Sequence, residues 1–266
     1  MINRKSLLAS GIAAAMFAMS SAGAAVLHSS NAGTAAQPSF PAPAGGSVIL
    51  YDQTDSAAGN GAPVQNFEAA YDIYDAEGAD DFVVPAGGWT IDQVNLVSTV
   101  GTPLTTTASV TFYADAGGVP SGTPSCSYPS APANVAAGGT TITLPTSCAL
   151  GAGTYWVAAI VDVNFATNGQ IFWSNRTVQS NSPAVWRNPG DGFGSGCTTF
   201  TAMTTCGVGG GTNPDFLFQI VGTVGGGGVP YAPARELPTL SQWSALAAMG
   251  GLALLGMFGL RRRSRR

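Results

Sequence analysis

The chain has 266 residues, a formal net charge of −4 and only one histidine, His28. Between residues 25 and 231 there are thirteen acidic residues against two bases, Arg176 and Arg187, so this central region carries a charge of 2 − 13 = −11. Such a charge repels phosphate backbones and argues against nucleic-acid binding. The region has no lysine, and its one histidine, His28, lies in the N-terminal stretch before residue 48, so the residues for a Ser-His-Asp triad or a histidine-based metal site are lacking.

Residues 1–24 predict a signal peptide. Arg4 and Lys5 form a basic start, residues 6–20 are moderately apolar, and Ala22-Gly23-Ala24 forms a small-residue cleavage site. The apolar part is short and rich in Ala, Gly and Ser, which favours Sec-dependent export and cleavage by signal peptidase over a first transmembrane helix. Residues 25–47, rich in Ala, Pro, Gly and Ser, predict a disordered spacer.

Residues 48–224 predict one all-β domain. Within residues 108–114, Val110 and Phe112 alternate with Thr111 and Tyr113, as in a strand with two different faces. Turns rich in Gly and Pro separate this run from similar ones. Short strands at this spacing are typical of an antiparallel β-sandwich or jelly roll. The expected strands are 48–51, 79–84, 90–98, 108–114, 140–144, 153–161, 170–175, 184–187 and 215–221.

The four cysteines of this domain predict two structural disulfides. Cys126 and Cys148 bracket a stretch rich in Pro, Ala and Gly, and Cys197 and Cys206 bracket a Thr-rich one. The sequence permits three connectivities, of which local pairing would close two loops with little apolar content of their own. Paired cysteines fit an oxidising compartment.

Five carboxylates lie within ten residues of one predicted loop. Calcium takes six to eight oxygen ligands from carboxylates, carbonyls and water in flexible loops, so the loop is a candidate calcium site, although it lacks the EF-hand pattern. Two other interpretations stay open: a solvated acidic loop, and a pair of carboxylates acting in glycoside hydrolysis. The five residues are Asp72, Asp75, Glu77, Asp80 and Asp81.

A second candidate site combines aromatic side chains with both arginines of the domain. Trp173, Arg176, Trp186 and Arg187 lie in a stretch rich in Asn, Ser and Gly. Aromatic faces flanked by amides and a guanidinium grip sugar rings, which makes a glycan a candidate ligand. The alternative is that both tryptophans are core residues of neighbouring strands and that both arginines pair with nearby acids.

The C-terminal end predicts a signal that directs the protein to the membrane, and a Gly/Pro linker at residues 225–236 precedes it. Residues 237–243 read Leu-Pro-Thr-Leu-Ser-Gln-Trp, and residues 244–260 are apolar. About 17 residues at 1.5 Å each give roughly 26 Å of helix, enough to span a thin hydrocarbon core. Cytoplasmic arginines would then stop transfer and place the domain outside the cytoplasm. These arginines are Arg261, Arg262, Arg263, Arg265 and Arg266.

This arrangement of motif, helix and basic end resembles the IPTL-CTERM sorting signal, a relative of the PEP-CTERM signals of Gram-negative bacteria that make extracellular polymer. Leu237 replaces the usual Ile. The residues that match the motif are Pro238, Thr239, Leu240, Ser241 and Trp243. The resemblance implies recognition by an exosortase-type membrane enzyme that removes the helix and passes the remainder to the cell surface. A permanent single-span anchor is the alternative.

The central domain also resembles, less specifically, the exported β-domains found upstream of interchangeable bacterial anchors, which bring no established chemistry. Its runs at residues 79–85, 110–120 and 153–157 carry this resemblance. We therefore expect a non-enzymatic structural or adhesive protein of the surface or extracellular matrix, with extracellular polysaccharide as a candidate partner. A calcium-dependent carbohydrate-binding module is the first alternative, and a carboxylate-based glycoside hydrolase is a distant one.

Overall fold

A computed structural model describes residue 38, residues 40–43 and residues 45–225. The predicted signal peptide, most of the spacer, the linker after Gly225 and the whole sorting tail lie outside the described residues. Among the residues that are described, no helix is both long enough and apolar enough to cross a membrane.

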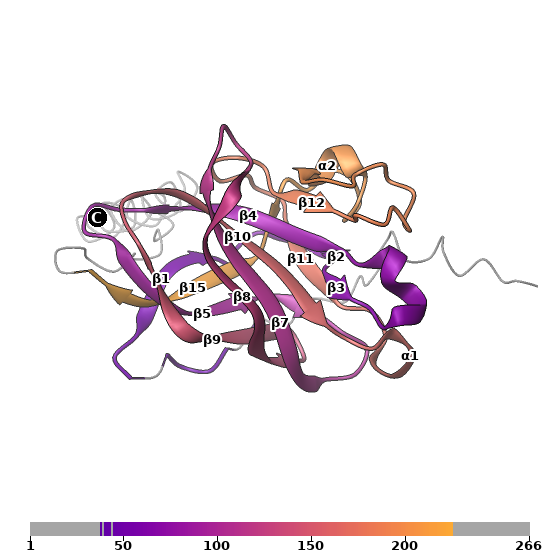
Figure 1. Cartoon of the computed structure of the whole chain (residues 1–266), viewed down its shortest axis with the longest axis horizontal. Helices are drawn as coiled ribbons and strands as arrows, with labels where there is room; N and C mark the ends of the chain where they lie inside the picture. The colour runs from indigo at the N-terminus through magenta and orange to yellow at the C-terminus, as the bar shows by residue number, and fades with distance from the viewer. Residues whose placement is uncertain (1–37, 39, 44, 226–266) are drawn as a thin grey trace, which may run out of the picture.

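Most of the described chain is antiparallel β-structure, which confirms the predicted all-β class (Figure 1). The larger of its two sheets has eleven strands in the order β1-β15-β5-β9-β8-β7-β10-β4-β12-β13, and β3 pairs in parallel with β10. Its strands are β1 (Val48–Gln53), β3 (Gln65–Asn66), β4 (Glu77–Val84), β5 (Trp89–Leu96), β7 (Leu104–Asp115), β8 (Pro120–Ala136), β9 (Gly139–Leu150), β10 (Gly153–Asp162), β12 (Val185–Arg187), β13 (Thr201–Ala202) and β15 (Phe218–Val224).

The smaller sheet has four strands and lies against the larger one. β11 is its centre, with β14 and β2 on either side and β6 also paired to β11. Three short helical turns complete the described chain. The strands are β2 (Ala57–Pro63), β6 (Ser98–Thr99), β11 (Phe172–Arg176) and β14 (Asp215–Phe216), and the turns are η2 (Ala69–Tyr74), α1 (Phe165–Asn168) and α2 (Met203–Cys206).

The large sheet curls so that its two halves face each other across one core. Phe82 of β4 stacks on Trp89 of β5 with ring centroids 6.0 Å apart, and it lies 6.1 Å from Tyr51 of β1. These strands are far apart in the sheet order, so such contacts require the sheet to fold over on itself. Phe112 and Phe218 are completely buried in the same core.

The curl occurs where β8 and β9 separate. The two strands pair only between residues 133–136 and 139–142; before this point β8 follows β7, and after it β9 follows β5. The Cys126–Cys148 disulfide joins the two separated arms with a Cα–Cα distance of 6.0 Å. The gap between the arms is therefore closed by the hairpin turn at one end and by a covalent bond toward the other.

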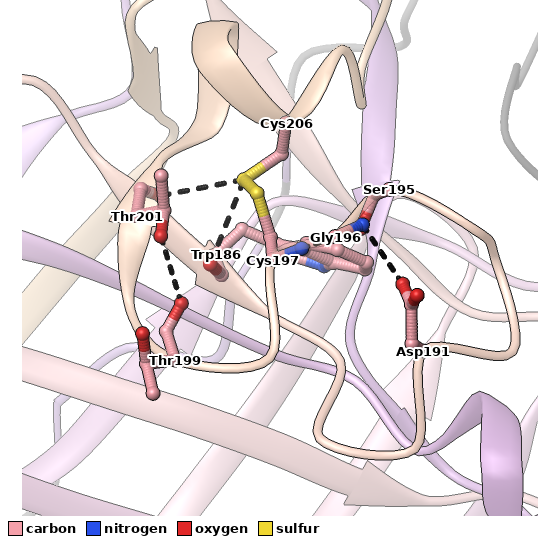
Figure 2. The surroundings of a disulfide bond; sticks show 8 residues. All are labelled: Trp186, Asp191, Ser195, Gly196, Cys197, Thr199, Thr201 and Cys206. Carbon is pink, nitrogen blue, oxygen red and sulfur yellow. Dashed lines mark hydrogen bonds between the residues drawn. A yellow bond between two sulfur atoms is a disulfide. The ribbon is translucent and has the colours of Figure 1, made fainter.

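The second disulfide, Cys197–Cys206, closes a loop that covers the outer face of the sheet. Figure 2 shows it beside Trp186 and Thr201. Within this loop Phe200 packs edge-on against Tyr113 of β7, next to a small outer core cluster that includes the buried Trp156. The two disulfides predicted from the sequence are therefore confirmed, and of the three connectivities that the sequence permitted the structure has the local one.

Each predicted strand overlaps an observed one, but two of them divide between the sheets. Residues 90–98 form β5 in the large sheet and then β6 in the small one, and residues 215–221 likewise form β14 and then β15. The break occurs at Val97 and Leu217, where the Val97 N–H donates to the Leu217 carbonyl oxygen at 3.0 Å. A strand that changes sheets keeps its alternation, so its pattern does not reveal the bend.

Residues 127–139, which precede the predicted strand at 140–144, were expected to be a loop, and this expectation was wrong. They form the second half of β8 and the turn into β9, with Tyr128, Ala131, Ala133 and Val135 buried. In the sequence, the prolines of this stretch argue against a strand because proline has no N–H to donate to a hydrogen-bond ladder between strands. The prolines of β8 are tolerated because they precede residue 133, in the part of β8 that has β7 as its only partner. Pro145 of β9 lies between the pairs Gln93–Thr143 and Ile91–Cys148, where the register with β5 shifts.

We predict that removing the Cys126–Cys148 bond opens the gap between β8 and β9. Replacing both cysteines by Ala should lower the free energy of unfolding by about 3 kcal/mol, as expected for a closed loop of this size. Urea unfolding measures the loss, and hydrogen exchange should increase in residues 127–131. The matched control replaces Cys197 and Cys206 and should leave this exchange unchanged. Equal exchange in both variants would show that the disulfide does not hold the arms together.

Candidate functional site

The five acidic residues predicted as calcium ligands bind different partners. The Phe67 N–H donates to Asp75 Oδ1 at 2.7 Å, and Arg187 forms an ion pair with Glu77. Asp80 and Asp81 lie inside β4 with no exposed surface, whereas Asp72 is exposed in η2. Among the described residues there is no group of three or more His, Cys, Asp or Glu side chains arranged to hold a metal ion.

Asp80 is the centre of a buried polar network where the two sheets meet. Its Oδ2 accepts hydrogen bonds from Gln53 Nε2 at 3.0 Å and from the Phe216 N–H at 2.7 Å, and its Oδ1 accepts from the Asp81 N–H at 2.8 Å. Gln53 in turn accepts from the Tyr51 hydroxyl at 2.6 Å. The Asp80 carboxylate thus connects β1 and β4 of the large sheet with β14 of the small sheet.

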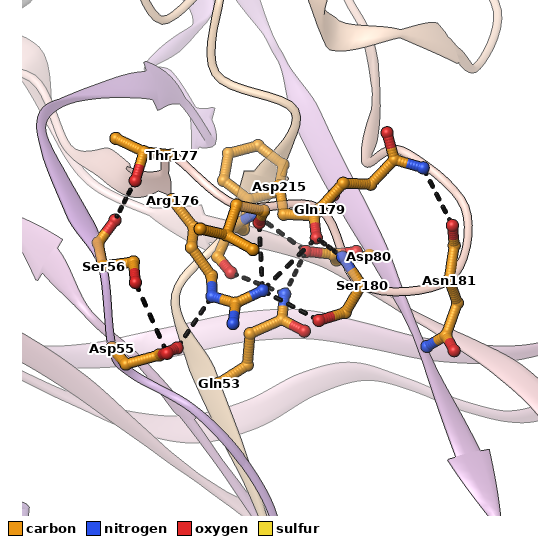
Figure 3. A network of polar contacts seen from close by, with 12 residues as sticks. Gln53, Asp55, Ser56, Asp80, Arg176, Thr177, Gln179, Ser180, Asn181 and Asp215 are labelled. Atoms are coloured by element: carbon orange, nitrogen blue, oxygen red, sulfur yellow. Dashed lines mark hydrogen bonds and ion pairs between the residues drawn. The ribbon is translucent and has the colours of Figure 1, made fainter. Parts of the chain in front are cut away.

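Arg176 extends the network to the other side of the small sheet (Figure 3). Its Nε contacts Asp55 Oδ1 at 2.8 Å, and its Nη1 lies 3.8 Å from Asp215 Oδ2. The same Nη1 donates to the Val178 carbonyl oxygen at 2.9 Å and to Ser180 Oγ at 2.8 Å. One guanidinium therefore ties β11 to the turn between β1 and β2, to β14 and to the loop that follows β11.

Two of the buried carboxylates also hold the loop between β11 and β12. The Ser180 N–H donates to Asp215 Oδ2, and the Ser182 N–H donates to Asp81 Oδ2 at 3.1 Å. Asn181, which has a positive φ of 57°, lies between these two attachments. The loop is consequently fixed by charge-assisted hydrogen bonds to side chains from two different sheets.

Burial controls the electrostatics of the network. It raises the pKa of Asp80 well above the usual range, and the Asp215 charge raises it further. It raises the pKa of Asp215 to about 7, although Ser180 and Arg176 oppose this shift. Burial also raises the pKa of Asp81. Three acids thus share an enclosed volume with a single arginine, and protonation relieves the excess negative charge.

The arrangement is suited to fastening the two sheets together. Asp80, Asp81 and Asp215 are all 0 % exposed, so a substrate has no route to their carboxylates in this structure. Asp215 Oδ1 is buried and makes no hydrogen bond within the described part of the chain. Burial raises the pKa of this carboxyl group to about 7, which places its titration near neutral pH.

The structure places the predicted sugar-binding tryptophans in the core. Trp173 and Trp186 are both 0 % exposed, and their indole N–H groups donate to the carbonyl oxygens of Leu217 and Pro63 at 2.8 and 2.7 Å. Trp173 also stacks on Phe216 with ring centroids 4.3 Å apart. Neither ring presents a face to a ligand, so the core interpretation holds for both.

Both arginines of the predicted sugar site form ion pairs with acidic residues, as expected in the alternative interpretation of that site. Arg176 pairs with Asp55, and the Arg187 guanidinium pairs with Glu77 while its centre lies 4.2 Å above the Phe200 ring. The sequence did not indicate that Gln53 and Asp215 belong to the network. They lie 27 residues before and 135 residues after Asp80, so only the folded sheets bring them together.

We predict that the domain is more stable in mild acid than at neutral pH. Below about pH 4 both states are protonated at Asp215, and between pH 4 and 7 only the folded state keeps the proton. The free energy of unfolding should therefore fall over this range, by up to about 1.4 kcal/mol per pH unit for the Asp215 proton, and the contribution of Asp215 should be lost once the pH exceeds about 7. Chemical unfolding at several pH values measures this slope.

The test compares Asp215→Asn with Asp92→Asn, a change at a half-buried carboxylate on β5. The first variant should flatten the pH dependence, and the second should leave it as in the wild type. An unchanged slope in Asp215→Asn would show that this carboxyl group does not hold the proton.

No family model matches this chain, and no curated protein or solved structure matches it either. Its function is therefore argued from its residues and their geometry.

Proposed function

We propose that this protein is an exported, non-enzymatic β-protein with a structural or adhesive role at the cell surface or in the extracellular matrix. The observation that carries the proposal is the pairing of all four cysteines in two disulfides, one between β8 and β9 and one that closes the loop containing β13. Disulfides of this kind persist in oxidising compartments outside the cytoplasm. The acidic charge of the domain suits a soluble exported protein.

The route of export in this proposal follows from the two ends of the sequence. Signal peptidase would remove residues 1–24 after Sec-dependent export from the cytoplasm of a Gram-negative bacterium. The motif at 237–243, the apolar stretch at 244–260 and the terminal arginines resemble an IPTL-CTERM signal, which calls for an exosortase-type enzyme. The linker at 225–236 would hold the domain clear of the membrane until the tail is processed.

The domain itself is proposed to be a variant of the β-sandwich. Contacts of Phe82 with Tyr51 and Trp89 across the core support two facing layers, although both layers belong to one curled sheet. The burial of Asp80, Asp81 and Asp215 favours a role in holding these layers over a role in hydrolysis. A carbohydrate-binding module is less favoured because the two tryptophans proposed to grip the sugar are core residues.

We predict that the mature protein in its own host lacks both ends and is found at the surface or in the medium. Intact mass spectrometry and cell fractionation measure this directly. A variant with Pro238→Ala and Trp243→Ala should instead stay in the inner membrane with its arginines attached, because the processing enzyme has lost its motif. Replacing Thr223, an exposed residue at the end of β15, by Ser is the matched control and should be processed normally.

A wild-type protein that keeps Arg261–Arg266 in the inner membrane would overturn the sorting part of the proposal. In that case the domain is permanently anchored, and its partners lie in the periplasm.

A further inference from the structure

The segment between β3 and β4 forms a compact projection at one end of the domain. Its ends are closed on each other: the Ala76 N–H donates to the Gln65 carbonyl oxygen at 3.0 Å, and the Phe67 N–H donates to Asp75 Oδ1 at 2.7 Å. The 3₁₀ turn η2 lies between these closures. In Figure 1 this indigo turn lies beside β3 and α1, at the opposite end of the long axis from the yellow end of β15.

A buried asparagine fixes the backbone of the projection from the side. Asn188 is 0 % exposed, and its Nδ2 donates to the carbonyl oxygens of Ile73 and Asp75 at 2.7 and 2.8 Å. Gly192 adds an N–H bond of 2.9 Å to the same Ile73 oxygen. A Cβ atom on Gly190 or Gly192 would lie 2.5 or 2.6 Å from that oxygen, so only glycine permits this close packing.

The α1 turn fixes the projection from the other side. Both Glu68 oxygens accept hydrogen bonds from α1, with the Phe165 N–H at 2.7 Å and the Ala166 N–H at 3.1 Å. The Phe165 ring packs against Tyr71 at 5.5 Å and against Phe67 at 6.0 Å. The backbone of η2 is thus held from both sides before any partner arrives, which lowers the entropy cost of binding.

The rigid turn exposes apolar side chains to solvent. Tyr71 is 37 % exposed and Ile73 is 55 % exposed, and Ala69 and Ala70 beside them are also exposed. The other large exposed apolar residues among those described, Val83, Val119 and Val178, come from separate segments. Single exposed apolar residues need no explanation, but a group of them on a fixed turn marks an interaction surface.

The surroundings of this surface are acidic. Asp72 is exposed within η2, and Asp162 lies near enough that its charge, with that of Asp72, adds to the effect of burial in raising the pKa of Asp75. The two basic side chains of the described chain, Arg176 and Arg187, are paired with acids elsewhere. A partner that complements this surface therefore carries positive charge around an apolar centre.

Nearby polar groups that would grip a sugar are already in use. Asn66 donates to Asp162 at 2.7 Å, Asn164 Oδ1 accepts from the Thr167 N–H at 3.1 Å, and Glu68 caps α1. The rings of Tyr71 and Phe165 meet at 70°, so they form no flat platform for a pyranose. Free apolar side chains together with a free carboxylate favour a polypeptide over a glycan.

We propose that η2, through Tyr71, Ile73 and Asp72, is a docking surface for a basic, apolar segment of another protein. The inference rests on the proposed function, because an adhesive surface protein needs a contact that faces away from its point of attachment. The chain continues from Gly225 at the other end of the domain, so this surface remains accessible while the tail is anchored.

The test uses the full-length chain in phosphatidylcholine nanodiscs, with empty nanodiscs as the blank. The probe is a fluorescent peptide of alternating leucine and lysine, whose binding is measured by fluorescence anisotropy. Carbodiimide then couples the peptide amines to nearby carboxylates, and mass spectrometry maps the coupled residues. The comparison peptides alternate leucine with glutamate, to reverse the charge, and serine with lysine, to remove the apolar part.

The wild type should bind the leucine–lysine peptide at least about tenfold more tightly than either comparison peptide, with coupling at Asp72. The Tyr71→Ser, Ile73→Ser double variant should lose about tenfold in affinity and lose that coupling. The matched control, Val119→Ser with Val178→Ser, removes comparable exposed apolar surface elsewhere and should bind as the wild type does. Circular dichroism should show all three proteins folded at the assay temperature. Tyr71→Ser also removes a ring contact with Phe165 and should lower the thermal midpoint, so Ile73→Ser alone, at the more exposed residue, is measured as well and should lose affinity with an unchanged midpoint.

Three results would overturn the proposal. Equal binding of the serine–lysine peptide would show attraction by charge alone, and equal losses in both variants would show binding without a defined site. A dimer seen by sedimentation that disappears in the Tyr71→Ser, Ile73→Ser variant would assign the surface to a second copy. Because binding is measured on purified protein, the outcome is independent of where the protein is found in the cell.

Discussion

The structure depends on one constraint: a long sheet with few helices to cover it must bury its own apolar face. The chain meets this constraint by bending the sheet between β8 and β9, which brings Phe82 of one half onto Trp89 of the other. Because of the bend, β8 and β9 do not pair with each other over most of their length. This is why the Cys126–Cys148 bond lies where it does, and why a strand rich in proline is tolerated beside it.

The same bend creates the place where the small sheet attaches. β5 is followed by β6 of the small sheet and β15 is preceded by β14 of the small sheet, so the two sheets share two crossings as well as the hydrogen bonds of Asp80. Putting Asp80, Asp81 and Asp215 into this junction has a cost in desolvation, which is visible in their raised pKa values. In return, Asp80 accepts three hydrogen bonds, Asp81 accepts two and Asp215 accepts one, and together these bonds fix the sheets and the β11–β12 loop in one arrangement.

The two ends of the domain are built differently. Toward the end of β15 the chain leaves the domain in the direction of its predicted tail, and at the opposite end η2 is fastened by Asn188, Gly192 and Glu68 while Tyr71 and Ile73 face water. Such a division suits a protein that is attached at one end and makes contact at the other. Burial, and not residue type, decides the roles of the aromatic side chains discussed above. Trp173 and Trp186 are buried and stabilise the core, whereas Tyr71 is accessible to solvent.

The sequence by itself determined the all-β class and the positions of most strands, because alternation is a local property of the chain. It predicted two disulfides but permitted three connectivities, and the fold decided between them. It also singled out Asp80, Asp81, Arg176 and Trp186 as unusual. Only the tertiary structure decided the roles of these side chains. Gln53, Asp80 and Asp215 meet because the fold brings together three strands that are distant in the sequence. The same holds for β8, whose prolines are acceptable only because the curl leaves that part of the strand with a single neighbour.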